Sequence, residues 1–208
     1  MHEHGRLGPI EWATAGRPLP GEQLSGDQPI AVGIGDDAAL FGVLDGLGHG
    51  PAAATAALRA VDALSGARNE RLEVLVQLCH RVLAGTRGAA MTLARVDFAA
   101  GMLTWTGVGN VSANLVAKAA SGIQIRSSAR LDAGIVGYRI PEIRPAQVVS
   151  IRAGDLIVIT SDGITEDHLD HIDFAAPATV IAEQILGKHA KETDDAMVLA
   201  ARHRGTST

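Results

Sequence analysis

Residues 38–50 read Ala-Ala-Leu-Phe-Gly-Val-Leu-Asp-Gly-Leu-Gly-His-Gly. The run from Ala38 to Leu44 is short, apolar and bounded by Asp37 and Asp45, which predicts a buried strand. An acidic side chain at the end of such a strand is costly unless a partner compensates its charge, and a divalent cation is one such partner. The glycines that follow allow backbone and ligand to approach closely. The stretch therefore predicts a buried strand that ends in a charged site.

The same pattern returns near the other end of the chain, where the apolar run Leu156 to Thr160 is followed by Ser161-Asp162-Gly163. Asp-Gly is also a common turn dipeptide, so a turn explains either pair taken singly. Two apolar strands that both end in Asp-Gly instead predict that the carboxylates of Asp45 and Asp162 meet at one site. Hard divalent cations such as Mg²⁺ and Mn²⁺ prefer oxygen ligands of this kind. Two such ions can clamp a phosphoryl group, so the pattern favours metal chemistry on phosphate.

The composition indicates a folded globular protein. The chain has 208 residues, of which 47% are hydrophobic, enough for one domain over residues 1–208 with a sizeable core. The net charge of −5, the scattered Lys and Arg residues and the 3% aromatic content argue against a nucleic-acid partner. No apolar stretch approaches the roughly 20 residues that span a bilayer, so no membrane partner is expected.

The single cysteine and the N-terminus indicate the compartment. Cys79 lies among Leu75, Leu78 and Val82, which predicts a thiol buried in the core of a protein from a reducing compartment. The first residues lack the order of basic and then apolar residues that marks a signal peptide. We therefore expect a cytoplasmic protein.

Hydrophobic periodicity and turn residues predict an α+β fold with antiparallel sheets, because strands cluster in runs and helices are set apart. Strands are expected at 10–15, 38–44, 90–96, 102–108, 111–117, 123–126, 148–151, 156–160 and 196–201. Helices are expected from Pro51, over 70–84 and over 177–186, with Gly187 ending the last. Residues 152–155 are expected to form a hairpin turn. His2 and His4 are expected in a frayed terminus, and Pro29 is expected to break any long element.

Four motifs resemble those of the SpoIIE-like bacterial phosphatases, which belong to the metal-dependent type 2C (PPM) class of protein serine/threonine phosphatases. The stretch Asp45-Gly46-Leu47-Gly48-His49-Gly50 resembles their Asp-Gly-x-Gly-His-Gly element. The other three resembling stretches are Ser25-Gly26-Asp27, Thr160-Ser161-Asp162-Gly163 and Asp194-Asp195-Ala196-Met197-Val198. They occur in the family's order and cover about residues 20–200, nearly the whole chain.

The resemblance implies a four-layer α-β-β-α sandwich, with two antiparallel sheets flanked by helices, and two bound Mn²⁺ or Mg²⁺ ions. Asp45 and Asp162 take the catalytic positions, and Asp45 has two oxygens with which to bridge both ions. The implied metal ligands are Asp27, Asp45, the carbonyl of Gly46, Asp162 and Asp194. Asp195 is expected to play a supporting or surface role, because adjacent residues in a strand point to opposite faces.

Two further stretches resemble the RsbX-type members of this family, which act in bacterial stress signalling. They are Arg87-Gly88-Ala89 and Val108-Gly109-Asn110-Val111. The likeness implies a phosphoserine or phosphothreonine substrate on stressosome scaffold proteins of the RsbR and RsbS type, or on anti-sigma antagonist proteins. Met197 stands where the family usually has Thr or Ser, which implies a change in packing.

Several roles stay open at this point. His49 is either a general acid or a residue that opens the following helix and bonds the backbone there, and we favour the second. Gly109-Asn110 is expected to be a tight turn rather than a phosphate contact. Arg87 fits a phosphate contact and a surface salt bridge equally well. A non-catalytic binding module on a degenerate phosphatase fold and a hydrolase of small phosphoesters are the alternative functions.

Overall fold

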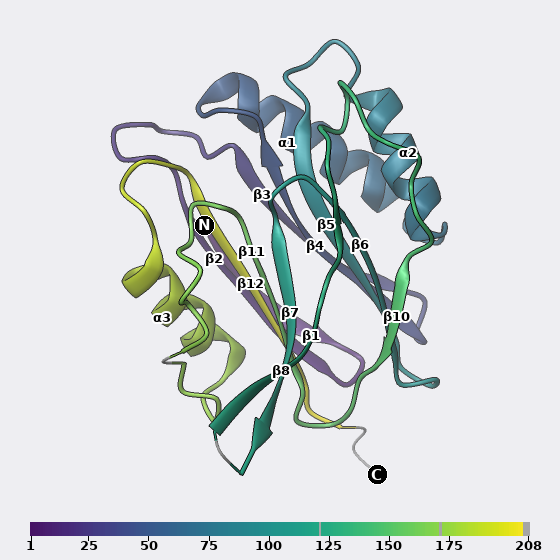
Figure 1. The fold of residues 1–208 in the computed structure, drawn as a ribbon, viewed down its shortest axis with the longest axis vertical. Helices are drawn as coiled ribbons and strands as arrows, with labels where there is room; N and C mark the ends of the chain where they lie inside the picture. The colour runs from purple at the N-terminus through teal and green to yellow at the C-terminus, as the bar shows by residue number, and fades with distance from the viewer. Residues whose placement is uncertain (121, 171, 206–208) are drawn as a thin grey trace.

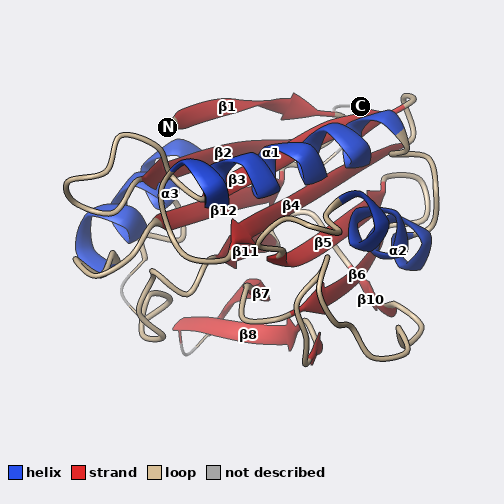
Figure 2. Ribbon diagram, turned by 90° about the horizontal axis from the view of Figure 1, so that it is seen from above, coloured by secondary structure: helices blue, strands red, loops and turns tan. Residues whose placement is uncertain are grey.

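The computed structural model describes residues 1–120, 122–170 and 172–205. Within these residues two mostly antiparallel sheets pack face to face (Figures 1 and 2). The first sheet has the order β1 (His2–Leu7), β2 (Ile10–Arg17), β12 (Ala196–His203), β11 (Leu156–Thr160), β7 (Ser112–Ala119) and β8 (Gly122–Ser128). The second has the order β10 (Gln147–Ser150), β6 (Met102–Val108), β5 (Ala89–Asp97), β4 (Ala38–Gly46) and β3 (Asp27–Ile34). The short β9 (Leu131–Asp132) pairs in parallel with β6.

Helices cover both outer faces, which confirms the predicted four-layer α-β-β-α sandwich. Helices α1 (Pro51–Gly66) and α2 (Leu72–Val82) pack on the second sheet, and α3 (Ala178–His189) packs on β2 and β12 of the first. Three apolar clusters follow from this stacking: one under α1 and α2, one between the sheets and one under α3. No helix in the described part of the chain has the length and apolar content needed to cross a bilayer.

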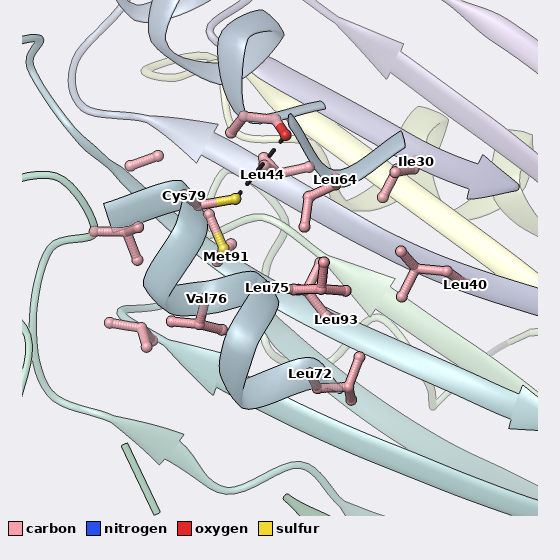
Figure 3. Packing of buried hydrophobic residues seen from close by; sticks show 14 of the residues in the cluster. Ile30, Leu40, Leu44, Leu64, Leu72, Leu75, Val76, Cys79, Met91 and Leu93 are labelled. Atoms are coloured by element: carbon pink, nitrogen blue, oxygen red, sulfur yellow. Dashed lines mark hydrogen bonds between the residues drawn. The ribbon is translucent and has the colours of Figure 1, made fainter. Parts of the chain in front are cut away.

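The layer under α1 and α2 shows why alanine is so frequent in this chain. Ala53, Ala57 and Ala60 are fully buried and let α1 lie close to β4 and α2. Cys79 of α2 points into this layer among leucine side chains (Figure 3), and its Sγ lies 3.9 Å from the Ala60 carbonyl oxygen. Burial raises the pKa of this thiol to about 12, so it stays protonated and unreactive. The prediction of a core thiol is confirmed.

The N-terminal segments differ from the prediction. Residues His2–Leu7 form strand β1 rather than a frayed end, and the terminal amine of Met1 donates to the Gly16 carbonyl oxygen. Residues Asp27–Ile34 form strand β3 in spite of Pro29. Proline is tolerated there because β3 is the edge of its sheet, where one side of the strand needs no ladder hydrogen bonds. Both are edge strands. Strand β1 has no apolar run, whereas Ile30 to Ile34 of β3 form one directly after Pro29.

Two local predictions are wrong in detail. Strands β10 and β11 do not form a hairpin, because β10 pairs with β6 and β11 pairs with β7 and β12 in the other sheet. The turn at residues 152–155 therefore carries the chain from one sheet to the other. Gly187 lies inside α3, which continues to His189. The prediction from sequence that joins 90–96 to 102–108 and 111–117 to 123–126 as hairpins is confirmed by the β5–β6 and β7–β8 pairs, and the helix start at Pro51 is confirmed as well.

Candidate metal centre

The pairing of β3 and β4 brings two of the predicted site residues together. Asp27 opens β3 and stands directly opposite Asp45 near the end of β4 in the antiparallel register. Asp162 follows β11, and Asp194 and Asp195 precede β12, which pairs with β11. Strand β12 contacts β3 and β4 across the sandwich, and the charges of Asp162, Asp194 and Asp195 act on both Asp27 and Asp45, so these acidic residues from both sheets lie together.

The glycine of each Asp-Gly pair lies against backbone. A Cβ atom on Gly46 would lie 2.2 Å from the carbonyl oxygen of Ala53, in the first turn of α1. A Cβ atom on Gly163 would lie 1.8 Å from the carbonyl oxygen of Asp195. No side chain fits at such distances. These glycines therefore let α1 close on β4, and let the loop after β11 close on the start of β12.

The Asp27 carboxyl lies at the centre of the acidic group. Its residue is 1% exposed, and Oδ2 has no hydrogen-bond partner in the described residues. Burial, together with the charges of Asp195, Asp162 and Asp194, raises the pKa of Asp27 to about 7 although the Ser161 hydroxyl lowers it. A buried carboxylate oxygen without a donor is costly, and a cation removes that cost. This orphaned atom fits a bound divalent ion.

Asp45 and Asp194 belong to the same electrostatic environment. Burial first, and then the neighbouring charges of Asp27, Asp162 and Asp194, raise the pKa of Asp45 to about 9. Burial and the charge of Asp162 also raise the pKa of Asp194. The carboxylates converge without forming a closed ligand cage: within the described residues no three Asp, Glu, His or Cys side chains stand at metal-binding geometry.

These pKa shifts predict that the metal-free protein loses stability as the pH rises. Asp27 and Asp45 have folded-state pKa values of about 7 and about 9, above the ordinary value of 3.8, so the folded protein holds these protons more tightly than the unfolded chain does. Their contribution to the free energy of unfolding is complete below about pH 4 and is lost as the pH rises through the folded-state pKa values. Thermal unfolding in a chelator at about pH 6 and about pH 9 measures this change. A melting temperature that does not fall with pH would contradict the assignment of the shifts.

Asp195 is held by the backbone rather than turned to the other carboxylates. Its Oδ1 accepts a hydrogen bond from the Leu19 amide at 2.7 Å, and its Oδ2 accepts one from the Gly26 amide at 2.8 Å. Both bonds are buried or partly buried, and they tie the loop before β3 to the start of β12. Asp195 therefore positions Asp27 through the neighbouring Gly26.

Asn110 has a role that the sequence prediction missed. Its Nδ2 donates to Oδ2 of Asp162 at 2.6 Å and fixes that carboxylate. The left-handed backbone of this turn falls on Gly109, with φ of 94°, and not on Asn110. The expected turn is present, but the asparagine is there for its side chain. Nothing in the local sequence marks it, because the two residues are 52 positions apart.

The structure bears on the open roles of His49, in the loop after β4, and of Arg87, in front of β5. Among the residues that the structure describes, the His49 side chain bonds no backbone group: its Nδ1 lies 2.8 Å from Oε1 of Glu22, and α1 has no side-chain cap. The exposed Arg87 lies over the same loop, with Nη1 3.5 Å from the carbonyl oxygens of Leu47 and His49. No salt bridge to Arg87 is found in the described part of the chain, so its charge stays available at the edge of the site.

Lys191 is a second residue at the site that the sequence prediction missed. Its Nζ donates to the Asp162 carbonyl oxygen at 2.6 Å, and its amide donates to the Gly163 carbonyl oxygen at 2.8 Å. Its positive charge lowers the pKa of Asp194 against the effects of burial and Asp162. Lys191 thus joins the second Asp-Gly turn to the loop before β12.

Comparisons with known proteins agree with this architecture. The sequence profile of the family described as stage II sporulation protein E (SpoIIE) matches residues 35–205. A comparison with curated protein sequences found no match. One solved structure, from work on the bacterial stressosome as a modular system adapted to control secondary messenger signalling, is 33% identical with a TM-score of 0.83. The match covers 93% of this chain and 99% of that one.

Two more distant structures share the fold. RsbX in complex with magnesium is 19% identical with a TM-score of 0.82, covering 97% of this chain and 99% of that one. The catalytic domain of the serine/threonine protein phosphatase PstP with two manganese ions is 17% identical with a TM-score of 0.66, covering 93% and 97%. The family profile spans most of the chain, and the fold is that of these phosphatases. The chain therefore belongs to the SpoIIE family of PP2C-type protein serine/threonine phosphatases.

Proposed function

We propose that this phosphatase removes phosphate from phosphoserine or phosphothreonine of a protein partner with the help of divalent metal ions bound at the carboxylate end of the sandwich. One observation carries the proposal: Asp27 and Asp45 stand opposite each other, and the buried Asp27 Oδ2 has no hydrogen-bond partner in the described residues. Burial and mutual repulsion raise the pKa values of Asp27 and Asp45, and a divalent cation between the two carboxylates relieves both effects.

The proposed ligands are Asp27, Asp45, Asp162 and Asp194, with the carbonyl of Gly46 as an additional oxygen donor. An all-oxygen set of this kind suits Mg²⁺ and Mn²⁺, and the two related folds that hold magnesium and two manganese ions support it. When bound, two such ions polarise a phosphoryl oxygen and lower the pKa of a water molecule.

The protein's own residues set the position of these ligands. Asn110, between β6 and β7, holds the Asp162 carboxylate, and the Asp195 bonds to the Leu19 and Gly26 amides hold the loop that leads into Asp27. Lys191 fixes the carbonyl of Asp162. Preorganised ligands of this kind lose less free energy on binding.

Arg87 is the proposed contact for the substrate phosphate. It is exposed at the edge of the site, and a guanidinium presents paired N–H donors that match phosphate oxygens. In the overall reaction the oxygen of a water molecule bonds to phosphorus and the bond from phosphorus to the Ser or Thr oxygen breaks. A proton passes to that leaving oxygen, so the products are inorganic phosphate and the free hydroxyl side chain.

The proposed partner is a cytoplasmic phosphoprotein of the stressosome type, on an RsbR-like or RsbS-like scaffold, or an anti-sigma antagonist. Support comes from the 33% identical relative, which belongs to work on the bacterial stressosome, and from the RsbX fold. The net charge is −5, and the Lys and Arg residues are scattered rather than clustered in the sequence. We therefore expect the enzyme to recognise its protein partner through weak surface contacts.

Release of inorganic phosphate from phosphoserine and phosphothreonine peptides tests the proposal. We expect turnover with Mn²⁺ or Mg²⁺ and none with a chelator. Free phosphoserine is the comparison substrate, and we expect a much higher kcat/KM for the phosphopeptide. Equal turnover of both would point to a hydrolase of small phosphoesters, and no metal-dependent turnover of either would point to a non-catalytic module.

A further inference from the structure

The turn formed by residues 133–141, here called the Tyr138 turn, carries an aromatic side chain that nothing in the described residues covers. Tyr138 is 80% exposed, more than any other large hydrophobic residue in the described part of the chain. Beside it lies an open pocket of about 490 Å³ lined by the turn's own residues, among them Ile135, Arg139 and Ile140. Exposed aromatic residues next to apolar surface are typical of protein interfaces.

Hydrogen bonds hold this turn in one conformation. Ile135 and Arg139 exchange backbone bonds of 2.7 and 2.9 Å, and Val136 exchanges two bonds of 2.9 Å with Ala89. The amide of Gly137 donates to Nδ1 of His80 in α2 at 3.0 Å. The turn is therefore fixed to both β5 and α2. A side chain presented on such a turn binds a partner with little loss of conformational entropy.

The same anchors place the turn beside the candidate metal centre. Ala89 is two residues from Arg87, and the Gly88 carbonyl oxygen accepts a bond from the Leu47 amide of the Asp45 loop. On the other side, the Asp132 carbonyl oxygen accepts a bond from the Gly109 amide, next to Asn110. The Tyr138 turn thus continues the edge of the site from both Arg87 and Asn110.

The charges along this edge favour a negatively charged partner. Arg87 and Arg139 are both exposed, and no carboxylate forms a salt bridge with either within residues 1–120, 122–170 and 172–205. A phosphorylated protein surface complements them.

We propose that the Tyr138 turn is the docking surface for the folded phosphoprotein substrate, which it contacts next to the phosphorylated residue. The proposal rests on the proposed function and adds where the protein part of the substrate binds. Tyr138 enters an apolar contact on the partner, and Arg139 faces its acidic groups. Tyrosine and arginine are the residue types that most often dominate binding at such surfaces.

The test compares a protein substrate with a small one. The probes are a phosphorylated RsbR-type or RsbS-type scaffold protein and para-nitrophenyl phosphate, both assayed with Mn²⁺. We expect Tyr138→Ala to raise KM for the phosphoprotein about 10-fold, the size of a binding hot spot, with kcat unchanged. Turnover of the small substrate should stay at the wild-type rate. Tyr138→Phe keeps the ring and should restore most of the affinity.

Ile125→Ala is the matched control, because Ile125 is also an exposed apolar residue but lies on β8 of the other sheet. It should change neither assay. Wild-type KM in Tyr138→Ala would overturn the docking proposal, as would an equal loss on both substrates or a dimer of this chain that only Tyr138→Ala dissociates. If the wild type turned over neither substrate, the proposed function itself would fail, which is a different result.

Discussion

Asp45→Asn is expected to lower kcat/KM for a phosphopeptide by about 1,000-fold, because the amide removes a charge from the centre of the carboxylate group. The side chain keeps its size, so the register of Asp27 opposite Asp45 stays intact. The same change removes the cost of burying a charge, and the repulsion from the neighbouring carboxylates, which together raise the pKa of Asp45 to about 9. The metal-free variant should therefore unfold at a higher temperature than the wild type at about pH 8. Phosphate release and thermal unfolding measure the two effects.

Asp36→Asn is the matched control, since Asp36 is an exposed acid on the turn that precedes β4. It should leave both activity and melting temperature near the wild-type values. If Asp45→Asn kept more than a tenth of the wild-type kcat/KM, the catalytic role of Asp45 would be contradicted. A loss of activity explained by unfolding of the variant would also contradict that role.

Gly163→Ala is expected to have the largest effect on stability. The added Cβ atom would lie 1.8 Å from the Asp195 carbonyl oxygen and 3.2 Å from the Ala196 Cα, both in the backbone at the start of β12. Backbone of a central strand has little room to move, so we expect the free energy of unfolding to fall by about 3 kcal/mol. Activity should fall as well, because the Asp162 carboxylate belongs to the same turn. Chemical denaturation measures the loss.

Gly187→Ala is the matched control for Gly163→Ala, and we expect it to stabilise the protein rather than destabilise it. Gly187 lies within α3, and its added Cβ atom would meet no atom within 4 Å. Alanine has the higher helix propensity, so the protein should gain about 0.5–1 kcal/mol. A Gly163→Ala protein as stable as Gly187→Ala would contradict the close packing of the two loops.

The central strands and the acidic motifs could be predicted from the sequence because their signals are local. Apolar runs such as Ala38–Leu44 identify buried strands, and the motifs around Asp45 and Asp162 follow directly after them. Strand β1 is not predicted because it is a polar, partly exposed edge strand without such a run. Strand β3 has an apolar run, Ile30 to Ile34, but Pro29 in front of it predicts a break rather than a strand. The sequence around the β10–β11 connection predicts a hairpin, because nothing local shows that the chain changes sheets there.

The parts of the site that depend on long-range pairing could not be predicted. The bond from Asn110 to Asp162 and the bond from Lys191 to the Asp162 carbonyl join segments that meet only in the folded protein. The same holds for the Asp195 bonds to the amides of Leu19 and Gly26. Sequence motifs identify candidate ligands, whereas the residues that position them come from tertiary contacts.

The most direct test of the central claim is anomalous diffraction from crystals of the wild-type protein and of Asp45→Asn grown with Mn²⁺. We expect manganese peaks in the wild type bounded by the carboxylates of Asp27, Asp45, Asp162 and Asp194. These peaks should weaken or disappear in Asp45→Asn. No manganese between these carboxylates in the wild type, or the same peaks in both proteins, would show that they do not form the metal site.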